Sequence, residues 1–267
     1  MSLYKSFVSI GAGNVASHIV KSLCNAGYKL IQVYSRTQES AKILADPANA
    51  EFTTSIEEIM QGADLYIVSI PDLSVPLILE QLKITNSLIV HTAGSHGLEV
   101  FGTKFTRYGV LYPLQTIRKN TAVNMAKSPF LIEANNPVVL AEIEEIARSI
   151  SENVYLTDSE TRRWIHLAAV FANNFTNHML ALSSEILNQK KLDQTLLRPL
   201  IEETFRKALE SNPSEEQTGP AIRNDTNIIE KHIKMLENQP LLQKLYTFTS
   251  QSIQHTQSLK KNNSVNE

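Results

Sequence analysis

Up to about residue 155 the sequence alternates short apolar segments with segments of helical character, and this alternation restricts the fold more than any other feature. Several apolar segments are continuous, as expected of strands buried on both faces of a parallel sheet. Strands that alternate with helices predict a doubly wound α/β domain. The eight predicted strands are 6–10, 29–35, 51–54, 63–70, 87–93, 108–114, 129–134 and 153–157.

Two helices between these strands carry local start signals. Ser55 followed by Glu58 has the spacing of a capping box, and Gly62 has the character of the matching helix end. Asn136 followed by Pro137 has the character of an N-cap and a first-turn proline. We therefore expect one helix near 55–62 and another that begins at residue 137.

The sequence changes character after Thr157. Residues 158–191 contain neither glycine nor proline and are apolar on most sides, which predicts one long, buried helix. A second helix is expected over about 193–211, and more helix from the loop at 217–220 to about Ile253. The second part of the chain is therefore predicted to be all-α.

These patterns predict a domain organisation with two folded parts. We expect a dinucleotide-binding domain at 1–155, a helical substrate and dimerisation domain at 156–258, and a flexible polar tail at 259–267. A helix as apolar as that of 158–191 is more than a small domain can cover, and such helices often complete their burial in a dimer. We therefore expect a homodimer formed through the helical domain.

Composition excludes several classes of protein. Among the 267 residues 42% are apolar and 19% charged, and the formal net charge of −2 gives no field that attracts nucleic acid or an anionic membrane. The single cysteine, Cys24, excludes a disulfide framework and suits a reducing compartment. No apolar run approaches the roughly 20 residues that span a bilayer, and the first residues lack a signal-peptide core. We expect a cytoplasmic protein.

A glycine-rich turn, Gly11-Ala12-Gly13-Asn14-Val15-Ala16, joins the first predicted strand to a helix. Gly11 permits a tight turn, Gly13 lets the backbone approach a pyrophosphate, and Ala16 keeps the helix close to the sheet. The helix begins at Asn14 and Val15, and the free N–H groups of its first turn then face the phosphates. The alternative is a glycine turn that binds nothing, but its spacing and its position between strand and helix favour a dinucleotide site.

The end of the second predicted strand distinguishes NADP from NAD. An NAD site usually has an acidic residue there for the ribose 2′-hydroxyl, whereas this sequence has Ser35, Arg36 and Thr37. Arg36 can pair with a 2′-phosphate, and the two hydroxyls can donate to it. The alternative is a surface arginine next to a plain helix cap. We expect NADP, with NAD possible.

Three other strand ends carry polar residues where ligands of open α/β sheets bind. Pro71 is expected to shape the turn under the cofactor, His91 and Thr92 to lie near the nicotinamide, and Gln115 to contact substrate. The alternatives are that Pro71 belongs to an ordinary turn, that His91 is a buried structural histidine, and that Gln115 is an ordinary polar residue of a loop.

The long helix carries a polar stripe in an otherwise apolar sequence. His166, Asn173 and Asn177 are spaced i, i+7 and i+11, which places them on one face. Buried amides and imidazoles need partners, so the stripe is either a site or an interhelical hydrogen-bond network. Thr218 and Arg223, in the loop 217–225, are candidates for substrate binding, and Arg223 for a carboxylate; a salt bridge or cap is the alternative.

Reduction of a ketone or imine by hydride leaves a heteroatom that needs a proton. Histidine is the usual residue for this task near neutral pH. His166 is our first candidate for the general acid and His91 the second, with Asn173 beside His166 in the catalytic group. No cluster of metal ligands is visible, so no metal is expected.

Seven stretches carry a resemblance to a known family: "IGAGNVASHI", "VYSRT", "HTAGS", "GVLYPLQT", "DSETRRWIHLAAVFANNFTNHM", "LIEETFRKAL" and "QTGPAIRNDTNIIEKHIKML". The chain resembles bacterial Rossmann-like proteins with a DUF2520 C-terminal domain. More distantly it resembles the 6-phosphogluconate dehydrogenase superfamily, which includes β-hydroxyacid dehydrogenases, ketopantoate reductases and pyrroline-5-carboxylate reductases. The resemblance implies a Rossmann domain followed by a helical domain, an oxidoreductase activity and commonly a dimer.

One departure from that superfamily affects the chemistry. Its β-hydroxyacid dehydrogenases and ketopantoate reductases use a lysine on the first long helix of the second domain, and no lysine lies between Asp158 and Gln189. Either histidine replaces it, or the reaction needs less acid, as imine reduction does, or no turnover occurs. We expect an NADP-dependent oxidoreductase of a small carbonyl or imine acid. The alternative is a non-catalytic dinucleotide-binding, redox-sensing protein whose helical domain binds a partner.

Overall fold

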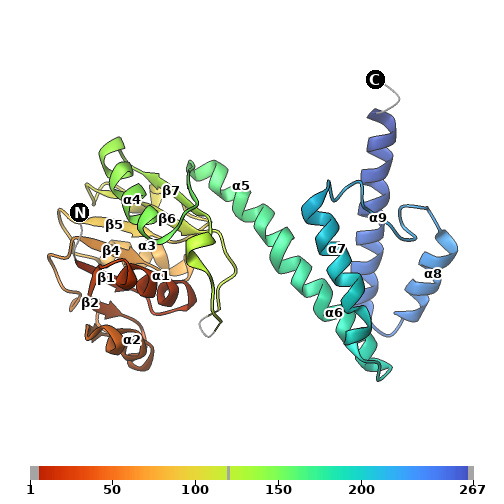
Figure 1. Cartoon of the computed structure of the whole chain (residues 1–267), viewed down its shortest axis with the longest axis horizontal. Helices are drawn as coiled ribbons and strands as arrows, with labels where there is room; N and C mark the ends of the chain where they lie inside the picture. Colours follow the sequence, from red (N-terminus) through yellow and green to blue (C-terminus); the bar gives the residue numbers. More distant parts are fainter. Residues whose placement is uncertain (1–5, 119–120, 264–267) are drawn as a thin grey trace. The chain divides into compact units, whose positions relative to one another are not determined.

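The computed structural model describes residues 6–118 and 121–263, and the strands among them form one eight-stranded sheet (Figure 1). The strand order is β3-β2-β1-β4-β5-β6-β7-β8, and every neighbouring pair is parallel except β6 with β7. All eight predicted strands are present. They are β1 (Ser6–Ile10), β2 (Lys29–Tyr34), β3 (Glu51–Thr53), β4 (Leu65–Val68), β5 (Leu88–His91), β6 (Tyr108–Pro113), β7 (Phe130–Ala134) and β8 (Val154–Leu156).

Helices cover both faces of this sheet, so the predicted doubly wound fold is confirmed. Successive residues of one strand point to opposite faces. Phe7 therefore joins the core formed with α1, α2 and α4, whereas its neighbour Val8 joins the core formed with α3 and η3. The helices of this part are α1 (Asn14–Asn25), α2 (Gln38–Ala45), α3 (Val75–Gln81) and α4 (Pro137–Ile150), with short 3₁₀ turns η1 (Asp46–Ala48), η2 (Asp72–Ser74), η3 (Leu98–Phe101) and η4 (Met125–Lys127).

The predicted start of α4 is confirmed. The Asn136 side chain accepts a hydrogen bond from the backbone N–H of Val139 at 3.0 Å, and Pro137 is the first helical residue. The cap satisfies one of the unpaired N–H groups of the first turn.

The helix predicted over 55–62 is wrong, because side chains from neighbouring strands take the backbone groups that a helix would pair. The Gln32 amide donates to the Glu58 carbonyl at 3.1 Å and accepts from the Met60 N–H at 2.7 Å. The Glu58 carboxylate accepts from the Thr53 hydroxyl at 2.6 Å and caps no helix. The segment is an ordered loop.

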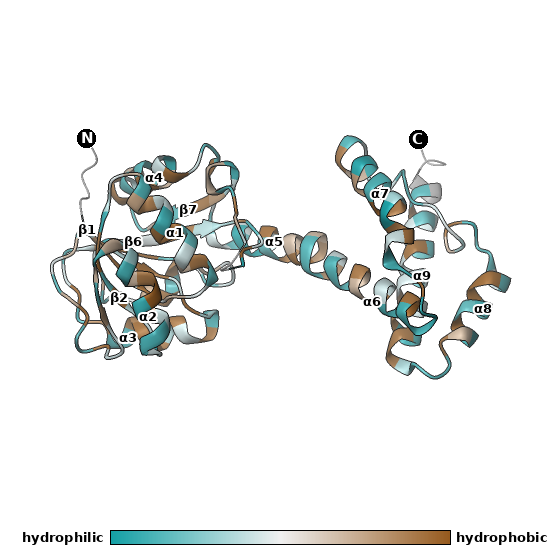
Figure 2. Cartoon of the chain, turned by 60° about the horizontal axis from the view of Figure 1, so that its bottom comes forward, coloured by the Kyte–Doolittle hydropathy of each residue, from teal (hydrophilic) through white to brown (hydrophobic). Residues whose placement is uncertain are grey.

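The long helix predicted after residue 157 is confirmed as a continuous element. It consists of α5 (Ser159–Ala169), the π-helical segment Val170–Phe175 and α6 (Thr176–Gln189). Its predicted burial is wrong for the single chain. Among its residues only Arg162 is buried, Trp164 is 66% exposed, and hydrophobic residues recur along its surface (Figure 2).

By its internal contacts the chain divides into two compact units on either side of the bond between Leu180 and Ala181. The predicted boundary after residue 155 stays a prediction. The second unit holds the end of α6, then η6 (Gln194–Leu197), α7 (Arg198–Glu210), α8 (Thr226–Met235) and α9 (Pro240–Asn263).

The second unit has a thin core in the single chain. Of the described residues after Leu180, only Ala221 and Ser250 are buried. Helix α9 continues to Asn263, beyond the predicted end at Ile253, and residues 264–267 of the predicted tail lie outside the described residues. No helix in the described part of the chain has the length and apolar character that a bilayer crossing requires.

Candidate functional site

The turn after β1 accepts only glycine at its first position. Gly11 has φ +121°, its N–H donates to the Tyr34 carbonyl at 2.8 Å, and a Cβ there would lie 2.1 Å from the Ser69 carbonyl oxygen. A Cβ on Gly13, in contrast, would meet no atom within 4 Å. The first glycine therefore closes the turn against β4, and the second leaves open space above the backbone, where a pyrophosphate fits.

Helix α1 begins at this turn without a side-chain cap. Gly13 is its N-cap, and the first turn holds no acidic residue. Ala16 is 1% exposed, so its small side chain lets the helix pack close to the sheet. The first N–H groups of α1 and the positive end of its dipole are thus available to an anion.

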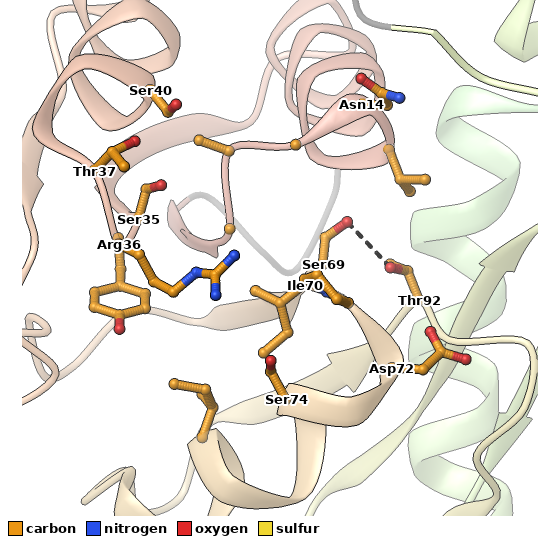
Figure 3. Close-up of a pocket in the computed structure, with 17 residues that line it drawn as sticks. Asn14, Ser35, Arg36, Thr37, Ser40, Ser69, Ile70, Asp72, Ser74 and Thr92 are labelled. Carbon is orange, nitrogen blue, oxygen red and sulfur yellow. Dashed lines mark hydrogen bonds between the residues drawn. The ribbon is translucent and has the colours of Figure 1, made fainter.

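The end of β2 has the groups expected for a ribose 2′-phosphate and no carboxylate. Thr37 is the N-cap of α2, but its hydroxyl makes no capping bond. Figure 3 shows Ser35, Arg36, Thr37 and Ser40 on one side of a pocket, with Asn14 and Thr92 on the other. One cation and three hydroxyls here can meet a phosphate.

This pocket has a volume of about 540 Å³ and brings together every residue predicted to bind the cofactor. The Thr92 hydroxyl donates to the Ser69 hydroxyl at 3.1 Å along its wall. The predicted residues that line it are Gly11, Gly13, Asn14, Val15, Ser35, Arg36, Thr37, Pro71 and Thr92.

His166 of α5 packs against the loop that follows β5. Its Nδ1 lies 2.9 Å from the hydroxyl of Tyr112, and the two rings meet edge to face. A Cβ on Gly94 would lie 2.7 Å from that Nδ1 and 3.0 Å from Cζ of Tyr112, so a glycine is needed beneath the pair. Because Gly94 follows Thr92 by two residues, the pair lies next to the wall of the cofactor pocket.

His91 does not suit the role of general acid. Its side chain is fully buried, it does not line the pocket, and its ring stacks on Phe101. Burial, with a contribution from the nearby charge of Arg162, lowers the pKa of His91 to about 3. The Ala93 N–H donates to its Nδ1 at 3.2 Å, so Nε2 carries the proton of a neutral ring. The interpretation as a buried structural histidine fits this geometry.

A buried ion pair fixes α5 to the sheet. Arg162 is fully buried, and its guanidinium pairs with Glu133 of β7 at 2.5 Å and donates to the His96 carbonyl at 2.7 Å. The Glu133 carboxylate also accepts from the N–H and the hydroxyl of Ser159. His96 in turn places a ring nitrogen 2.9 Å from the Asp72 carbonyl. Since His166 follows Arg162 by one helical turn, this network sets its position.

A second pocket, of about 560 Å³, brings the predicted Asn173 and Asn177 together with Asn14. Gln115 lies outside both pockets. Its amide accepts from the Thr116 N–H at 2.8 Å and donates to the Ser128 hydroxyl at 3.3 Å, so both ends are occupied within the loop.

Thr218 and Arg223 lie in the second unit, in the loop between α7 and α8, and both are exposed. Their predicted contact with substrate stays a prediction.

Sequence reasoning missed four residues of this region. Tyr112 and Glu133 lie within predicted buried strands, Arg162 is one of two adjacent arginines at the start of a helix, and Arg118, which lines the second pocket, lies in a loop. The one signal in the sequence was polarity inside an apolar strand, which Tyr112 and Glu133 share with many structural residues.

Two family models match the chain. The model described as "NADP oxidoreductase coenzyme F420-dependent" matches residues 7–94, and DUF2520, a domain of unknown function, matches residues 128–253. No curated protein matches the chain.

Solved structures resemble the chain over almost its full length. A Bacteroides fragilis protein described as a "putative NADP oxidoreductase" is 44% identical, with 94% of this chain and 98% of that one covered and a TM-score of 0.87. A Thermotoga maritima protein is 20% identical, with coverage of 94% and 99% and a TM-score of 0.78. The 1-pyrroline-5-carboxylate reductase of Streptococcus pyogenes, 14% identical with coverage of 94% and 98% and a TM-score of 0.58, shares the fold.

Proposed function

Because the chain belongs to the family of NADP oxidoreductases that carry a DUF2520 domain, we propose that it reduces a small acid bearing a carbonyl or imine group. The cofactor of this family is NADP, as predicted from the sequence. The observation that supports the proposal most is the cofactor pocket, because one cavity gathers a glycine turn, an uncapped helix start and a cationic end of β2.

The residues present fit NADP along the pocket. The open space above Gly13 and the N–H groups of α1 suit the pyrophosphate. Arg36, with the hydroxyls of Ser35 and Thr37, suits the 2′-phosphate, because a guanidinium pairs bidentately with phosphate and no carboxylate at this strand end opposes it.

His166 is the proposed proton donor. NADPH held in the pocket would supply a hydride to the carbonyl or imine carbon, and the electron pair of the double bond would be left on the heteroatom. The imidazolium form of His166 would give its Nε2 proton to that oxygen or nitrogen and be left as a neutral imidazole. Asn173 and Asn177 orient the substrate through their amides. The substrate contacts predicted for Thr218 and Arg223 stay predictions.

The alternative, a dinucleotide-binding protein without turnover, is less well supported. A redox sensor has no need of amides that line a separate pocket beside the cofactor. Asn173 and Asn177 are exposed and line that pocket, where their amides can reach a ligand.

A homodimer through the helical part is the proposed assembly. Large apolar side chains are exposed along α5, the π-helical segment and α6 as well as after Leu180, where the single chain buries almost nothing. Burial of apolar surface drives association, and an exposed surface of this extent marks an interaction site. The exposed residues along the long helix are Trp164, Leu167, Phe171, Phe175, Met179 and Ile186.

The experiment that tests the function is a titration of the full chain with NADPH and with NADH. Energy transfer from Trp164, the single tryptophan, to the nicotinamide reports binding. We expect NADPH to bind more tightly, and Arg36→Ala to weaken it about 10- to 100-fold, the effect of losing a charged hydrogen bond. NADPH oxidation is then followed with 2-oxo acids and cyclic imino acids, 1-pyrroline-5-carboxylate among them.

The matched control is Lys42→Ala, which removes a cation from the far end of α2. Equal binding of NADPH and NADH would remove the preference for NADP. Absence of binding to either would overturn the oxidoreductase proposal.

A further inference from the structure

The second pocket holds a set of polar groups that the cofactor does not use. We propose that it binds the carboxylate of the substrate and that Arg118 is the residue that holds it, an inference that rests on the proposed function. Its described lining residues are Asn14, Thr116, Ile117, Arg118, Thr121, Asn173, Asn174 and Asn177.

The long helix contributes three amides to this pocket through a π-helical turn. Asn173 and Asn174 lie within the segment Val170–Phe175, and Asn177 follows on α6. The Thr176 hydroxyl donates to the Phe171 carbonyl, five residues earlier, at 3.1 Å, which supports the wider turn. Such turns are rare and occur frequently at functional sites. The helix thus departs from regular geometry where it faces the pocket.

The charge of the pocket favours an anion. Arg118 is the one charged side chain among its described lining residues, and no carboxylate there opposes a bound acid. A guanidinium binds a carboxylate through two parallel hydrogen bonds. The amides add donors and acceptors for the other polar atoms of a small ligand. A small polar acid therefore matches this lining better than a neutral or cationic molecule.

Helix α1 holds the backbone of this arginine in place. His18 lies one helical turn after Asn14, and its Nε2 is 3.1 Å from the Arg118 carbonyl, to which it donates. Helix α1 therefore lines the pocket through Asn14, and through His18 it fixes the backbone of the loop that carries Arg118.

Asn14 lines both pockets, so an acid held by Arg118 lies beside the bound dinucleotide. Arg118 lines this pocket, whereas Arg223, predicted from the sequence for this task, is not among its described lining residues. The lining of the pocket therefore assigns the carboxylate to Arg118.

Calorimetry on the NADPH-saturated full chain tests this assignment. The probes are oxamate, a linear acid with an amide, and pyrrole-2-carboxylate, a planar cyclic acid. We expect at least one to bind and Arg118→Gln to weaken it about tenfold or more, the effect of losing a charge-assisted pair. Asn177→Leu is expected to weaken the same probe, and both variants to bind NADPH as the wild type does.

Two arginine variants serve as comparisons. Arg148→Gln removes an exposed cation of α4 and is expected to change nothing. If Arg223→Gln weakens the probe and Arg118→Gln does not, or if neither probe binds the NADPH-loaded protein, the assignment is overturned. Failure to bind NADPH is seen before any acid is added and overturns the proposed function instead.

Discussion

The hydroxyl of Tyr112, near the end of β6, lies 2.9 Å from Nδ1 of His166 on α5, with the ring centroids 5.9 Å apart. Burial raises the pKa of Tyr112, the charge of Asp72 raises it further, and that of Arg162 opposes them. The phenol therefore keeps its proton. It can donate that proton to Nδ1 of the uncharged imidazole, which then carries its own proton on Nε2, or accept from Nδ1–H of the imidazolium; in both forms Nε2–H is the group left for the substrate.

Removal of this hydroxyl tests the arrangement. In Tyr112→Phe we expect the fraction of His166 with its proton on Nδ1 to rise, measured by ¹⁵N chemical shifts, because the donor that favours the Nε2 form is gone. We expect kcat to fall about tenfold or more, within the range of general-acid contributions, and its pH profile to shift. Tyr155→Phe, which removes an exposed hydroxyl on β8, is the control. An unchanged tautomer ratio and pH profile would show that Tyr112 only packs against the ring.

The close approach at Gly94 gives a second prediction. In Gly94→Ala the new Cβ meets Nδ1 of His166 at 2.7 Å and Cζ of Tyr112 at 3.0 Å, so one ring must move. We expect a loss of about 1–3 kcal/mol in the free energy of unfolding, typical of overpacking, and a larger relative loss of turnover than of NADPH affinity. Turnover equal to that of the wild type would mean that His166 does not need this position.

The sequence predicted the sheet and the cofactor pocket well because both depend on local signals. Short segments typical of strands, several of them continuous apolar runs, predicted all eight strands, and the spacing of Gly11 and Gly13 predicted the turn. Local signals failed where a distant side chain competed. The capping-box pattern at Ser55 and Glu58 predicted a helix, but Gln32, on another strand, binds the backbone of that segment.

The candidate site was less predictable because its geometry depends on contacts distant in sequence. Tyr112 and His166 are 54 residues apart, and only the fold brings them together. In the sequence His91 could not be distinguished from a catalytic histidine, and only its complete burial in the fold shows that it does not suit this role. No local pattern in the sequence predicted the π-helical turn at Asn173 or the ion pair between Arg162 and Glu133.

The Arg162–Glu133 pair is predicted to stabilise the attachment of α5. Arg162→Met leaves a largely buried carboxylate without its cation, and breaking a buried pair in this way costs about 3–5 kcal/mol. Urea unfolding measures the loss. The double variant Arg162→Met/Glu133→Leu is expected to recover part of it, because no charge is then left unpaired.

Arg148→Met, which breaks an exposed pair with Glu144 on α4, is the control and is expected to change stability little. If Arg162→Met unfolds at the same urea concentration as the control, the buried pair does not hold the helix.

His91 is predicted to make the fold sensitive to acid. Its folded pKa of about 3 lies below the ordinary value of 6.5, so below about pH 6.5 the unfolded chain binds a proton that the folded chain does not. The contribution of His91 to the free energy of unfolding is therefore fully present above pH 6.5. It decreases by about 1.4 kcal/mol for each pH unit between pH 6.5 and pH 3.

The comparison is with His91→Gln, which keeps an acceptor for the Ala93 N–H but does not titrate. Urea unfolding at pH 7, 6, 5 and 4 should show the wild type losing stability relative to this variant at each step below pH 6.5. A difference between the two proteins that stays constant across this range would mean that His91 is protonated in the folded state, and its buried, neutral role would be wrong.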